Sequence, residues 1–348
     1  MSFEINYEKG NTEPRLPLIK VIGVGGAGGN AVNRMITEGI HGVTFIAANT
    51  DVQVLNSSEA EIKIQLGDHL TRGLGAGGDP KIGEHAAQES IEEITKELED
   101  TDLLFITAGM GGGTGTGAAP IIASVAREMG ILTVAVVTTP FFFEGNTRLK
   151  VAWEGLKQLR TSVDTMIRIS NNKLLQELPP DTSIVEAFAK ADETLHHGIK
   201  GISELITRRG YINLDFADVE SVLRNAGTAM LGIGVGEGDK RAEDAARAAM
   251  ESRLLEKPID NATGIILNVS AKNITLKEMN IAAAMVRQNC SEEADVKLGL
   301  IVDPEMNDEE LHITLIAAGF EMEEEMLGDT LDIPAIYRFG LDTQEEGM

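Results

Sequence analysis

The chain of 348 residues contains a single cysteine, Cys290, so it can form no internal disulfide and no zinc site built from cysteine ligands. Basic residues are scarce: 30 Lys and Arg stand against 55 Asp and Glu, which gives a net charge of −25. Such a chain offers no general attraction for nucleic acid or anionic lipid. No apolar run approaches the ~20 residues of a membrane span, and the N-terminal segment carries Glu4, Glu8 and Glu13 in place of the apolar core of a signal peptide. We expect a cytoplasmic protein with no nucleic-acid partner and no direct membrane insertion. Any anionic ligand must be bound by a local site, because the overall charge of the chain repels it.

The composition is that of an ordinary globular protein, with 43% apolar and 24% charged residues, and the length suits about two domains. From residue 18 to residue 170, short β-rich runs alternate with helical patterns, which predict helices at 30–38, 79–99, 116–129 and 147–159. The β-rich runs are continuous stretches of Val, Ile and Leu, which is typical of strands buried on both faces. The pattern predicts a Rossmann-like, doubly wound parallel sheet that binds ligands at the carboxyl ends of its strands.

A long segment without proline, residues 183–208, carries apolar residues at three- and four-residue spacing and predicts a helix of roughly 39 Å. We expect this helix to link two domains. After it, β-rich runs and helices at 240–256 and 276–289 predict a second, smaller α/β domain with a mixed sheet and no comparable glycine loop. Residues 321–348 carry a net charge of −8, which indicates a flexible tail. The predicted organisation is a flexible segment at 1–16, a ligand-binding domain at 17–180, a central linking helix at 181–209, a second domain at 210–320 and an acidic tail at 321–348.

Glycine-rich loops follow three of the predicted strands. The first, residues 23–30, satisfies G-x-G-x-x-G, and Asp51 ends the next strand, as in dinucleotide-binding sites. A tight strand-to-helix turn is the structural alternative. The second loop, residues 109–117, reads GMGGGTGTG, with six glycines in nine positions. Glycines let consecutive amides converge on an anion, and the following helix adds the positive end of its dipole.

The third glycine loop, GLGAGGDP at 73–80, also precedes a predicted helix. Three anion-binding loops suit a nucleoside triphosphate better than a dinucleotide. The Walker pattern G-x-x-x-x-G-K-[ST] is absent because the loops contain no lysine. The phosphates would be held by amides, helix dipoles and a cation.

The segment GMGGGTGTGAAP resembles the signature loop of the tubulin and FtsZ superfamily, and further segments from about Leu18 to Phe320 resemble the bacterial FtsZ family. These segments are GVGGAGGNAVNRM, AANTDVQVL, GLGAGGDPKIGEHAA, TTPFFFEGNTR, NNKLL, EAFAKADE and NLDFADV. The resemblance implies a self-assembling GTPase of bacterial cell division, located at a mid-cell ring, with GTP or GDP and Mg²⁺ as ligands. It also implies that 17–180 binds GTP and that 210–320 activates its hydrolysis.

The resemblance further implies which residues bind the nucleotide. The loops contribute Gly25, Gly26, Gly28, Gly29, Asn30, Asn49, Asp51, Ala76, Gly77, Gly111, Gly112, Gly113, Thr114, Gly115 and Thr116. Glu144 and Arg148 would contact ribose and phosphate, although their spacing also fits an i,i+4 ion pair. Phe188 would stack on the base, and Asp192 would hydrogen-bond to its Watson–Crick edge. Asn171 would belong to a further nucleotide loop. The alternatives are core packing for Phe188 and a solvated helix face for Asp192. A carboxylate can accept from both N1–H and N2–H₂ of guanine, and adenine has no such donor pair, so GTP is preferred to ATP.

Asn213, Asp215 and Asp218 in NLDFAD match the family's catalytic loop. The structural alternative is strong, because Asp at a helix start with a second Asp three residues later caps the helix. Asp192 and Arg208 lie 16 residues apart on one predicted helix, or roughly 24 Å, so the acidic loop cannot easily reach a nucleotide in its own chain. It could reach one on a subunit stacked head to tail. We therefore expect hydrolysis that depends on assembly into filaments.

The tail contains an apolar cluster, LDIPAIYRFGLD, that resembles the peptide by which the family engages membrane tethers and division regulators. Its docking residues would be Ile333, Pro334, Ile336, Tyr337 and Arg338. A disordered or folded-back tail is the alternative. No protein metal ligands are predicted. Two other functions stay open: a nicotinamide-dependent oxidoreductase, on the strength of the first loop and Asp51, and a filament scaffold that binds GTP without efficient hydrolysis.

Overall fold

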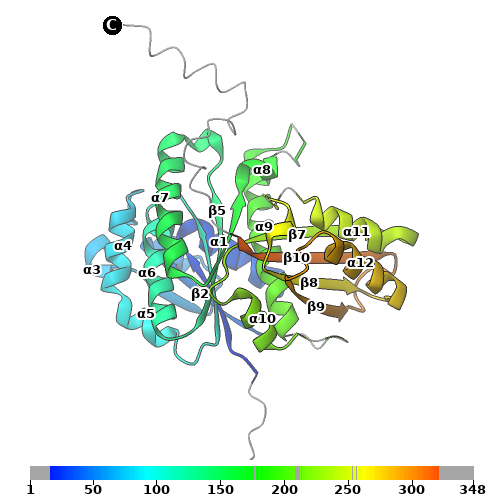
Figure 1. The fold of residues 1–348 in the computed structure, drawn as a ribbon. Coiled ribbons are helices and arrows are strands. Elements are labelled where there is room, and N and C mark those ends of the chain that lie inside the picture. The colour runs from blue at the N-terminus through cyan, green and yellow to red at the C-terminus, as the bar shows by residue number, and fades with distance from the viewer. Residues whose placement is uncertain are drawn as a thin grey trace, which may run out of the picture.

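The computed structural model describes residues 16–175, 178–179, 181–207, 212, 214–252, 254–255 and 257–320. Within them, ten strands form one sheet in the order β3-β2-β1-β4-β5-β6-β7-β10-β8-β9 (Figure 1). The strands are β1 (Ile19–Val24), β2 (Val43–Asn49), β3 (Ile62–Gln65), β4 (Leu103–Gly109), β5 (Leu132–Thr139), β6 (Thr165–Ser170), β7 (Gly227–Glu237), β8 (Gly264–Ala271), β9 (Asp295–Val302) and β10 (Glu310–Phe320). Strands β1 to β7 pair in parallel and β10 runs antiparallel to its two neighbours, so the sheet is mixed and mostly parallel, which confirms the predicted fold class.

Helices cover both faces of the first half of the sheet. They are α1 (Gly25–Thr37), α2 (Val52–Asn56), α3 (Asp68–Thr71), α4 (Pro80–Glu89), α5 (Ile91–Glu97), α6 (Thr114–Glu128), α7 (Asn146–Ser162) and α8 (Asn171–Leu175), with a 3-10 turn, η1 (Phe142–Glu144). Neighbouring residues of β1 pack into two separate hydrophobic cores. Val21 packs with residues of α1, and Ile22 packs with residues of α4 and α6. Burial on both faces explains why these strands are continuously apolar.

Several predicted helix boundaries are wrong; the helix predicted at 147–159, for example, continues to Ser162 as α7. The predicted helix at 79–99 is two helices, α4 and α5, because Ser90 leaves the helical path and its hydroxyl accepts a hydrogen bond from the Gly67 amide at 3.0 Å. The predicted helix at 240–256 ends early, as α11 (Arg241–Met250), because Ser252 begins a tight turn in which its carbonyl accepts from the Leu255 amide. The first helix begins at Gly25, inside the glycine loop, five residues before its predicted start.

Helix α9 (Ile184–Thr207) has 24 residues and is about 36 Å long. In Figure 1 it runs between α8, at the upper end of the molecule, and α10 (Phe216–Leu223), at the lower end. Leu195, Ile199 and Ile202 bury one face of α9 in the core shared with α1 and the central strands. The sheet continues past this helix, since residues 165–167 of β6 pair with residues 227–229 of β7. The predicted second α/β unit therefore extends the first sheet.

The second half of the sheet is covered by α11 and α12 (Leu276–Gln288), with 3-10 turns η2 (Gly238–Lys240) and η3 (Ile259–Asn261). Helix α11 packs closely on β7, and glycines of the strand make this possible. A Cβ atom on Gly232 would collide with the Ala249 carbonyl oxygen, and a Cβ atom on Gly234 would collide with the Ala245 carbonyl oxygen. The glycines of this strand therefore serve packing.

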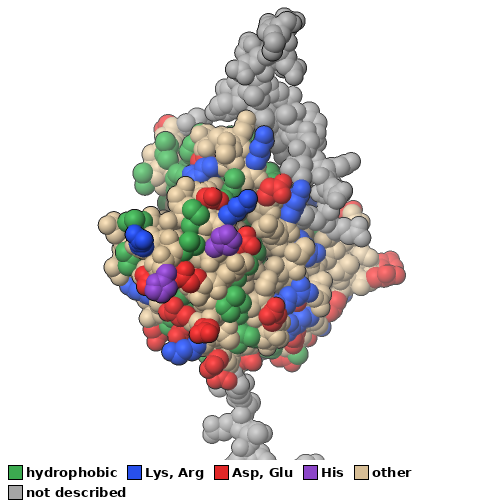
Figure 2. All heavy atoms as spheres, turned by 90° about the vertical axis from the view of Figure 1, so that its left-hand side faces the viewer, with side chains coloured by type: hydrophobic (Ala, Val, Ile, Leu, Met, Phe, Trp, Pro, Cys, Tyr) green, Lys and Arg blue, Asp and Glu red, His purple; other side chains and the backbone are tan. Residues whose placement is uncertain are grey.

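The side of the molecule formed by α3, α4 and α5 mixes acidic and basic side chains (Figure 2). On this face the basic side chains of the described residues gather in no large patch. Among the described helices, none combines the length and the apolar character that crossing a bilayer would need.

Candidate functional site

The three glycine loops meet at the carboxyl ends of the parallel strands. A Cβ atom on Gly25 would lie 2.9 Å from the Gly115 nitrogen, which joins the first loop to the second. A Cβ atom on Gly113 would lie 2.8 Å from the Cβ of Ala76, which joins the second loop to the third. The fold therefore brings together segments that are far apart in the sequence, at the edge where ligands of doubly wound sheets bind.

The predicted loop residues differ in exposure. The buried ones are Gly25, Gly28, Asn49, Ala76, Gly111, Gly113, Gly115 and Thr116, and those that are exposed or partly exposed are Gly26, Gly29, Asn30, Asp51, Gly77, Gly112 and Thr114. The second set forms the accessible surface of the site.

The loop glycines serve two purposes. A Cβ atom on Gly28 would collide with the Thr107 carbonyl oxygen, so that glycine is required by packing of α1 against the sheet. Nothing lies within 4 Å of a Cβ on Gly26 or Gly29, and neither residue has a positive φ. No contact among the described residues explains glycine at these two positions. A ligand that approaches the backbone closely would explain it.

Helices α1 and α6 both begin at this surface, and neither start is capped by a side chain, since Val24 and Gly113 occupy their N-cap positions. The acidic residues nearby cap other helices: Asp51 caps α2 and Asp79 caps α4. The amides and positive dipole ends of α1 and α6 suit an anion. In the cap of α2, Asp51 Oδ1 accepts hydrogen bonds from the Gln53 and Val54 amides. The buried Asn49 side chain accepts from the Asp51 amide at 3.2 Å. The cap uses only Oδ1 of Asp51, so the partly exposed carboxylate can still meet a ligand.

The two threonines of the second loop have different partners. Thr116 is 1% exposed, and its hydroxyl accepts a hydrogen bond from the Gly111 amide at 2.8 Å, which braces the loop internally. Thr114 is partly exposed, and its hydroxyl lies 2.6 Å from the Thr50 hydroxyl at the end of β2. Sequence reasoning missed Thr50, because only the tertiary structure places it beside the second loop.

Glu144 and Arg148 form the ion pair that their spacing allows, with Arg148 Nη1 2.6 Å from Glu144 Oε2. The other Glu144 oxygen accepts from the Phe141 amide at 2.9 Å. Arg148 remains 54% exposed, and its Nη2 lies 4.0 Å from where a Cβ on Gly112 would be. The start of α7 therefore adjoins the second glycine loop, and the ion pair leaves the guanidinium accessible to a ligand.

Three phenylalanines form an aromatic cluster beside these residues. The Phe141 and Phe143 rings stack at 5.1 Å between centroids, and Phe188 meets Phe141 edge-on at 5.2 Å. Phe143 and Phe188 are 53% and 41% exposed, which is unusual for phenylalanine. Phe141 and Phe143 were not predicted site residues, although the run FFFEG beside the Glu144 motif was a signal for them.

Asp192 lies one turn of α9 beyond Phe188. Burial raises the pKa of its carboxyl to about 6, against the opposing effect of the Arg34 charge. Arg34 of α1 also donates to the Ala189 carbonyl oxygen at 3.1 Å, which ties α1 to this part of α9. Asn171, at the start of α8, is 5% exposed, and its Oδ1 is a buried acceptor with no partner in the part of the chain that the structure describes. A ligand with an N–H or O–H group would satisfy the Asn171 oxygen.

The acidic loop lies beyond the other end of α9. Asp215 is exposed and caps α10, with Oδ1 accepting from the Asp218 amide at 2.8 Å, as the structural alternative predicted. Asp218 pairs with Lys297, whose Nζ lies 3.1 Å from Oδ1. Asn213 is outside the described residues, as are the five predicted docking residues of the tail.

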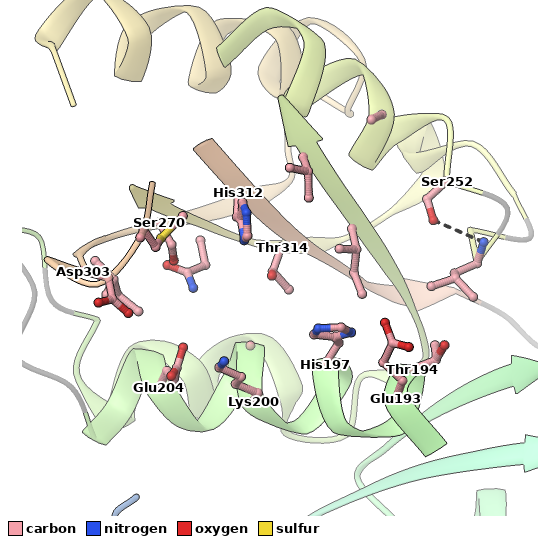
Figure 3. Close-up of a pocket in the computed structure, with 18 of the residues that line it drawn as sticks. Glu193, Thr194, His197, Lys200, Glu204, Ser252, Ser270, Asp303, His312 and Thr314 are labelled. Atoms are coloured by element: carbon pink, nitrogen blue, oxygen red, sulfur yellow. Dashed lines mark hydrogen bonds between the residues drawn. The ribbon is translucent and has the colours of Figure 1, made fainter. Parts of the chain in front are cut away.

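A cavity of about 700 Å³ lies elsewhere, between α9 and the second half of the sheet. In Figure 3, Glu193, His197 and Lys200 project from α9 toward His312 and Thr314 of β10. None of the glycine-loop residues lines this cavity. This cavity lies at the interface between α9 and the second half of the sheet and is separate from the glycine loops.

No group of three or more His, Cys, Asp or Glu side chains in the described ranges is arranged to hold a metal ion. Mg²⁺ bound together with a triphosphate needs no such cluster, because phosphate and water supply most of its ligands. The residues present are therefore compatible with a cation that accompanies the nucleotide.

Comparison with known proteins gives two matched regions on either side of α9. Residues 18–179 match the Tubulin/FtsZ family, GTPase domain, and residues 227–321 match the FtsZ family, C-terminal domain. Over 315 residues the chain is 50% identical to the cell division protein FtsZ of Coxiella burnetii, which covers 90% of this chain and 81% of that protein. An empty FtsZ dimer from M. jannaschii is similar in structure, with a TM-score of 0.84 and 45% identity over 87% of this chain and 88% of that chain. CetZ2 from Haloferax volcanii, a GTPγS-bound protofilament, shares the fold, with a TM-score of 0.76 and 22% identity over 88% and 94% of the two chains.

Proposed function

Because the chain belongs to the FtsZ family and contains its GTPase domain, we propose that it is a cell-division protein whose copies polymerise head to tail and hydrolyse GTP at their junctions. The chain binds guanine nucleotide and is a GTPase. One observation carries the finer proposal: the second glycine loop adjoins the first turns of α9 through Arg148, Phe141 and Phe188, whereas the acidic loop follows the other end of this helix, which is about 36 Å long. Each copy would supply the nucleotide pocket to one neighbour and the acidic loop to the other.

In the proposed site, the first amides of α1 and α6 hold the phosphates. Phe188 stacks on the base within the aromatic cluster, and ionised Asp192 accepts from guanine N1–H and N2–H₂. Mg²⁺ would lie beside the second loop, where the partly exposed Thr114 hydroxyl could hold it. When bound, the cation neutralises charge on the phosphates.

Hydrolysis requires a positioned water. Asp215 and Asp218 of the adjacent copy, together with Asn213, would orient and polarise the water that attacks the γ-phosphate. A head-to-tail contact that does not close into a ring extends into a filament. Nucleotide binding and assembly are then linked, and hydrolysis weakens the junction that made it possible.

Light scattering combined with phosphate release after GTP addition tests this function against its alternatives. Assembly with phosphate release is the expected result. Assembly without phosphate release would indicate a scaffold that binds GTP but does not turn it over efficiently. NAD binding without assembly would indicate an oxidoreductase.

Nucleotide affinity should fall as the pH decreases through the pKa of Asp192. The ionised carboxylate accepts from guanine, and protonation competes with binding below a pKa of about 6. Between pH 7.5 and pH 5.5 the ionised fraction, and with it the affinity for GDP, should fall about fourfold. Titration of a fluorescent GDP analogue measures this, with Asp192→Asn expected to bind more weakly and without this pH dependence. A wild-type affinity that is constant over this range would contradict the assignment of Asp192 to the base.

The acidic tail would connect the filament to membrane tethers and division regulators, and so place it at a mid-cell ring in the cytoplasm. Deletion of residues 329–348 should abolish binding to a tether but leave GTP turnover within about twofold of the full chain, because the tail lies outside both matched regions. Pull-down with candidate tethers and a phosphate-release assay measure the two effects. Loss of turnover in the truncated chain would show that the tail belongs to the reaction.

A further inference from the structure

Lys297 belongs to β9, the last strand of the sheet, and its side chain lies between the carboxylates of Asp218 and Asp295. Its Nζ is 3.1 Å from Asp218 Oδ1 and 3.3 Å from Asp295 Oδ2. Lys297 and Asp295 share one face of the strand because they are two residues apart. The Lys297 side chain is only 25% exposed, so this ammonium group is held in place more firmly than a lysine in open solvent.

The acidic loop has further attachments around this contact. The Leu300 amide of β9 donates to the Ile212 carbonyl oxygen at 3.0 Å, which fixes the backbone before the loop to the same strand. Asp215 then caps α10 through the Asp218 amide. The backbone of Asp218 is thus positioned by the cap, and its carboxylate by Lys297.

In the three described strands that α10 contacts most, Lys297 is the one basic residue. Helix α10 packs on β5, β8 and β9, and β5 and β8 contain no titratable residues. Among the residues that the structure describes, Lys297 of β9 pairs with Asp218, Asp295 pairs with the same Lys297, and Asp215 of the cap bonds the Asp218 amide. The hydrogen bond from Lys297 holds the pKa of Asp218 below its ordinary value, so Asp218 stays ionised at neutral pH.

We propose that Lys297 is a positioning residue that fixes the direction in which Asp218 presents its carboxylate to the GTP of the adjacent copy, an inference that rests on the proposed role of Asp218. Lys297 acts through Asp218 and needs no contact with the nucleotide. Without it, the carboxylate would rotate among several rotamers, and the attacking water would be oriented in only a fraction of the junctions.

The test uses the full chain with Lys297→Gln and Lys297→Arg, and with Lys157→Gln as a matched loss of charge on α7, where Lys157 is 45% exposed. Phosphate release is divided by the amount of pelleted polymer, and the critical concentration for assembly is measured separately. Lys297→Gln should lower turnover per polymerised subunit about tenfold, with a critical concentration within about twofold of wild type. Lys297→Arg should restore most of the turnover, and Lys157→Gln should match wild type.

Unchanged turnover per polymerised subunit in Lys297→Gln would overturn the inference. A rise in the critical concentration without a loss of turnover per polymerised subunit would also overturn it, because it would make Lys297 a structural residue of the junction. Asp218→Asn separates this failure from failure of the proposed function. If Asp218→Asn turns over GTP normally, the role of Asp218 itself is wrong; if it is inactive while Lys297→Gln is fully active, only the role of Lys297 is wrong.

Discussion

Replacement of Asp215 by asparagine is expected to lower GTP turnover by roughly 10²-fold or more, while nucleotide binding and filament formation remain intact. The substitution removes the charge that would polarise the attacking water. It keeps the cap of α10, which Asp215 provides through its 2.8 Å contact with the Asp218 amide, because asparagine caps helices about as well as aspartate. Phosphate release per polymerised subunit, with pelleting to measure the polymer, gives the result directly.

Asp215→Ala distinguishes the two roles of this residue. It should lose turnover to the same extent and also lose about 1 kcal/mol of stability, because alanine cannot cap the helix. Glu154→Gln on α7, where the side chain is 71% exposed, is the matched charge control and should behave as wild type. If Asp215→Asn turns over normally and Asp215→Ala is merely less stable, Asp215 is a helix cap and nothing more.

Gly26→Ala is expected to weaken nucleotide binding strongly in a protein that folds normally. A Cβ atom at this position meets nothing within 4 Å and the backbone has no positive φ, so the protein itself has room for alanine. Alanine is also the better helix former, which should keep the stability equal or raise it by about 1 kcal/mol. The methyl group would stand where a phosphate approaches the first amides of α1, and GTP affinity should fall by roughly 100-fold, or about 2.7 kcal/mol. Thermal unfolding and nucleotide titration measure the two effects.

Gly28→Ala, two residues away, should have a different effect. Its Cβ would collide with the Thr107 carbonyl oxygen, and the misfit between α1 and the sheet should cost about 1–3 kcal/mol of stability. Comparison of the two variants separates the ligand contact from packing in one loop. Wild-type affinity in Gly26→Ala would mean that the phosphates do not approach the start of α1.

Much of the architecture follows from local patterns. The continuous apolar runs predicted parallel strands because these strands are buried on both faces, and the three- and four-residue spacing predicted α9 within one residue at each end. Helix breaks were not predictable, because they depend on distant partners. Ser90 ends α4 by accepting from the Gly67 amide, 23 residues away, and a helical pattern in the sequence contains no information about that contact.

The site was predictable to the extent that it is built from loops. The glycine loops are recognisable because their composition is improbable for any other purpose, and the structure brings them together at one edge of the sheet. Side chains that act through tertiary contacts were missed. Thr50 meets Thr114 across 64 residues, and Lys297 meets Asp218 across the gap between α10 and β9, so neither pair has a signature spacing.

The most direct measurement of the central claim is GTP turnover per subunit as a function of protein concentration, from far below to well above the threshold for assembly. If each copy holds half of a reaction centre, turnover per subunit should be close to zero in the dilute protein and should rise steeply once polymer forms. A rate per subunit that is the same at every concentration would mean that a single copy contains the whole centre, and would contradict the shared site.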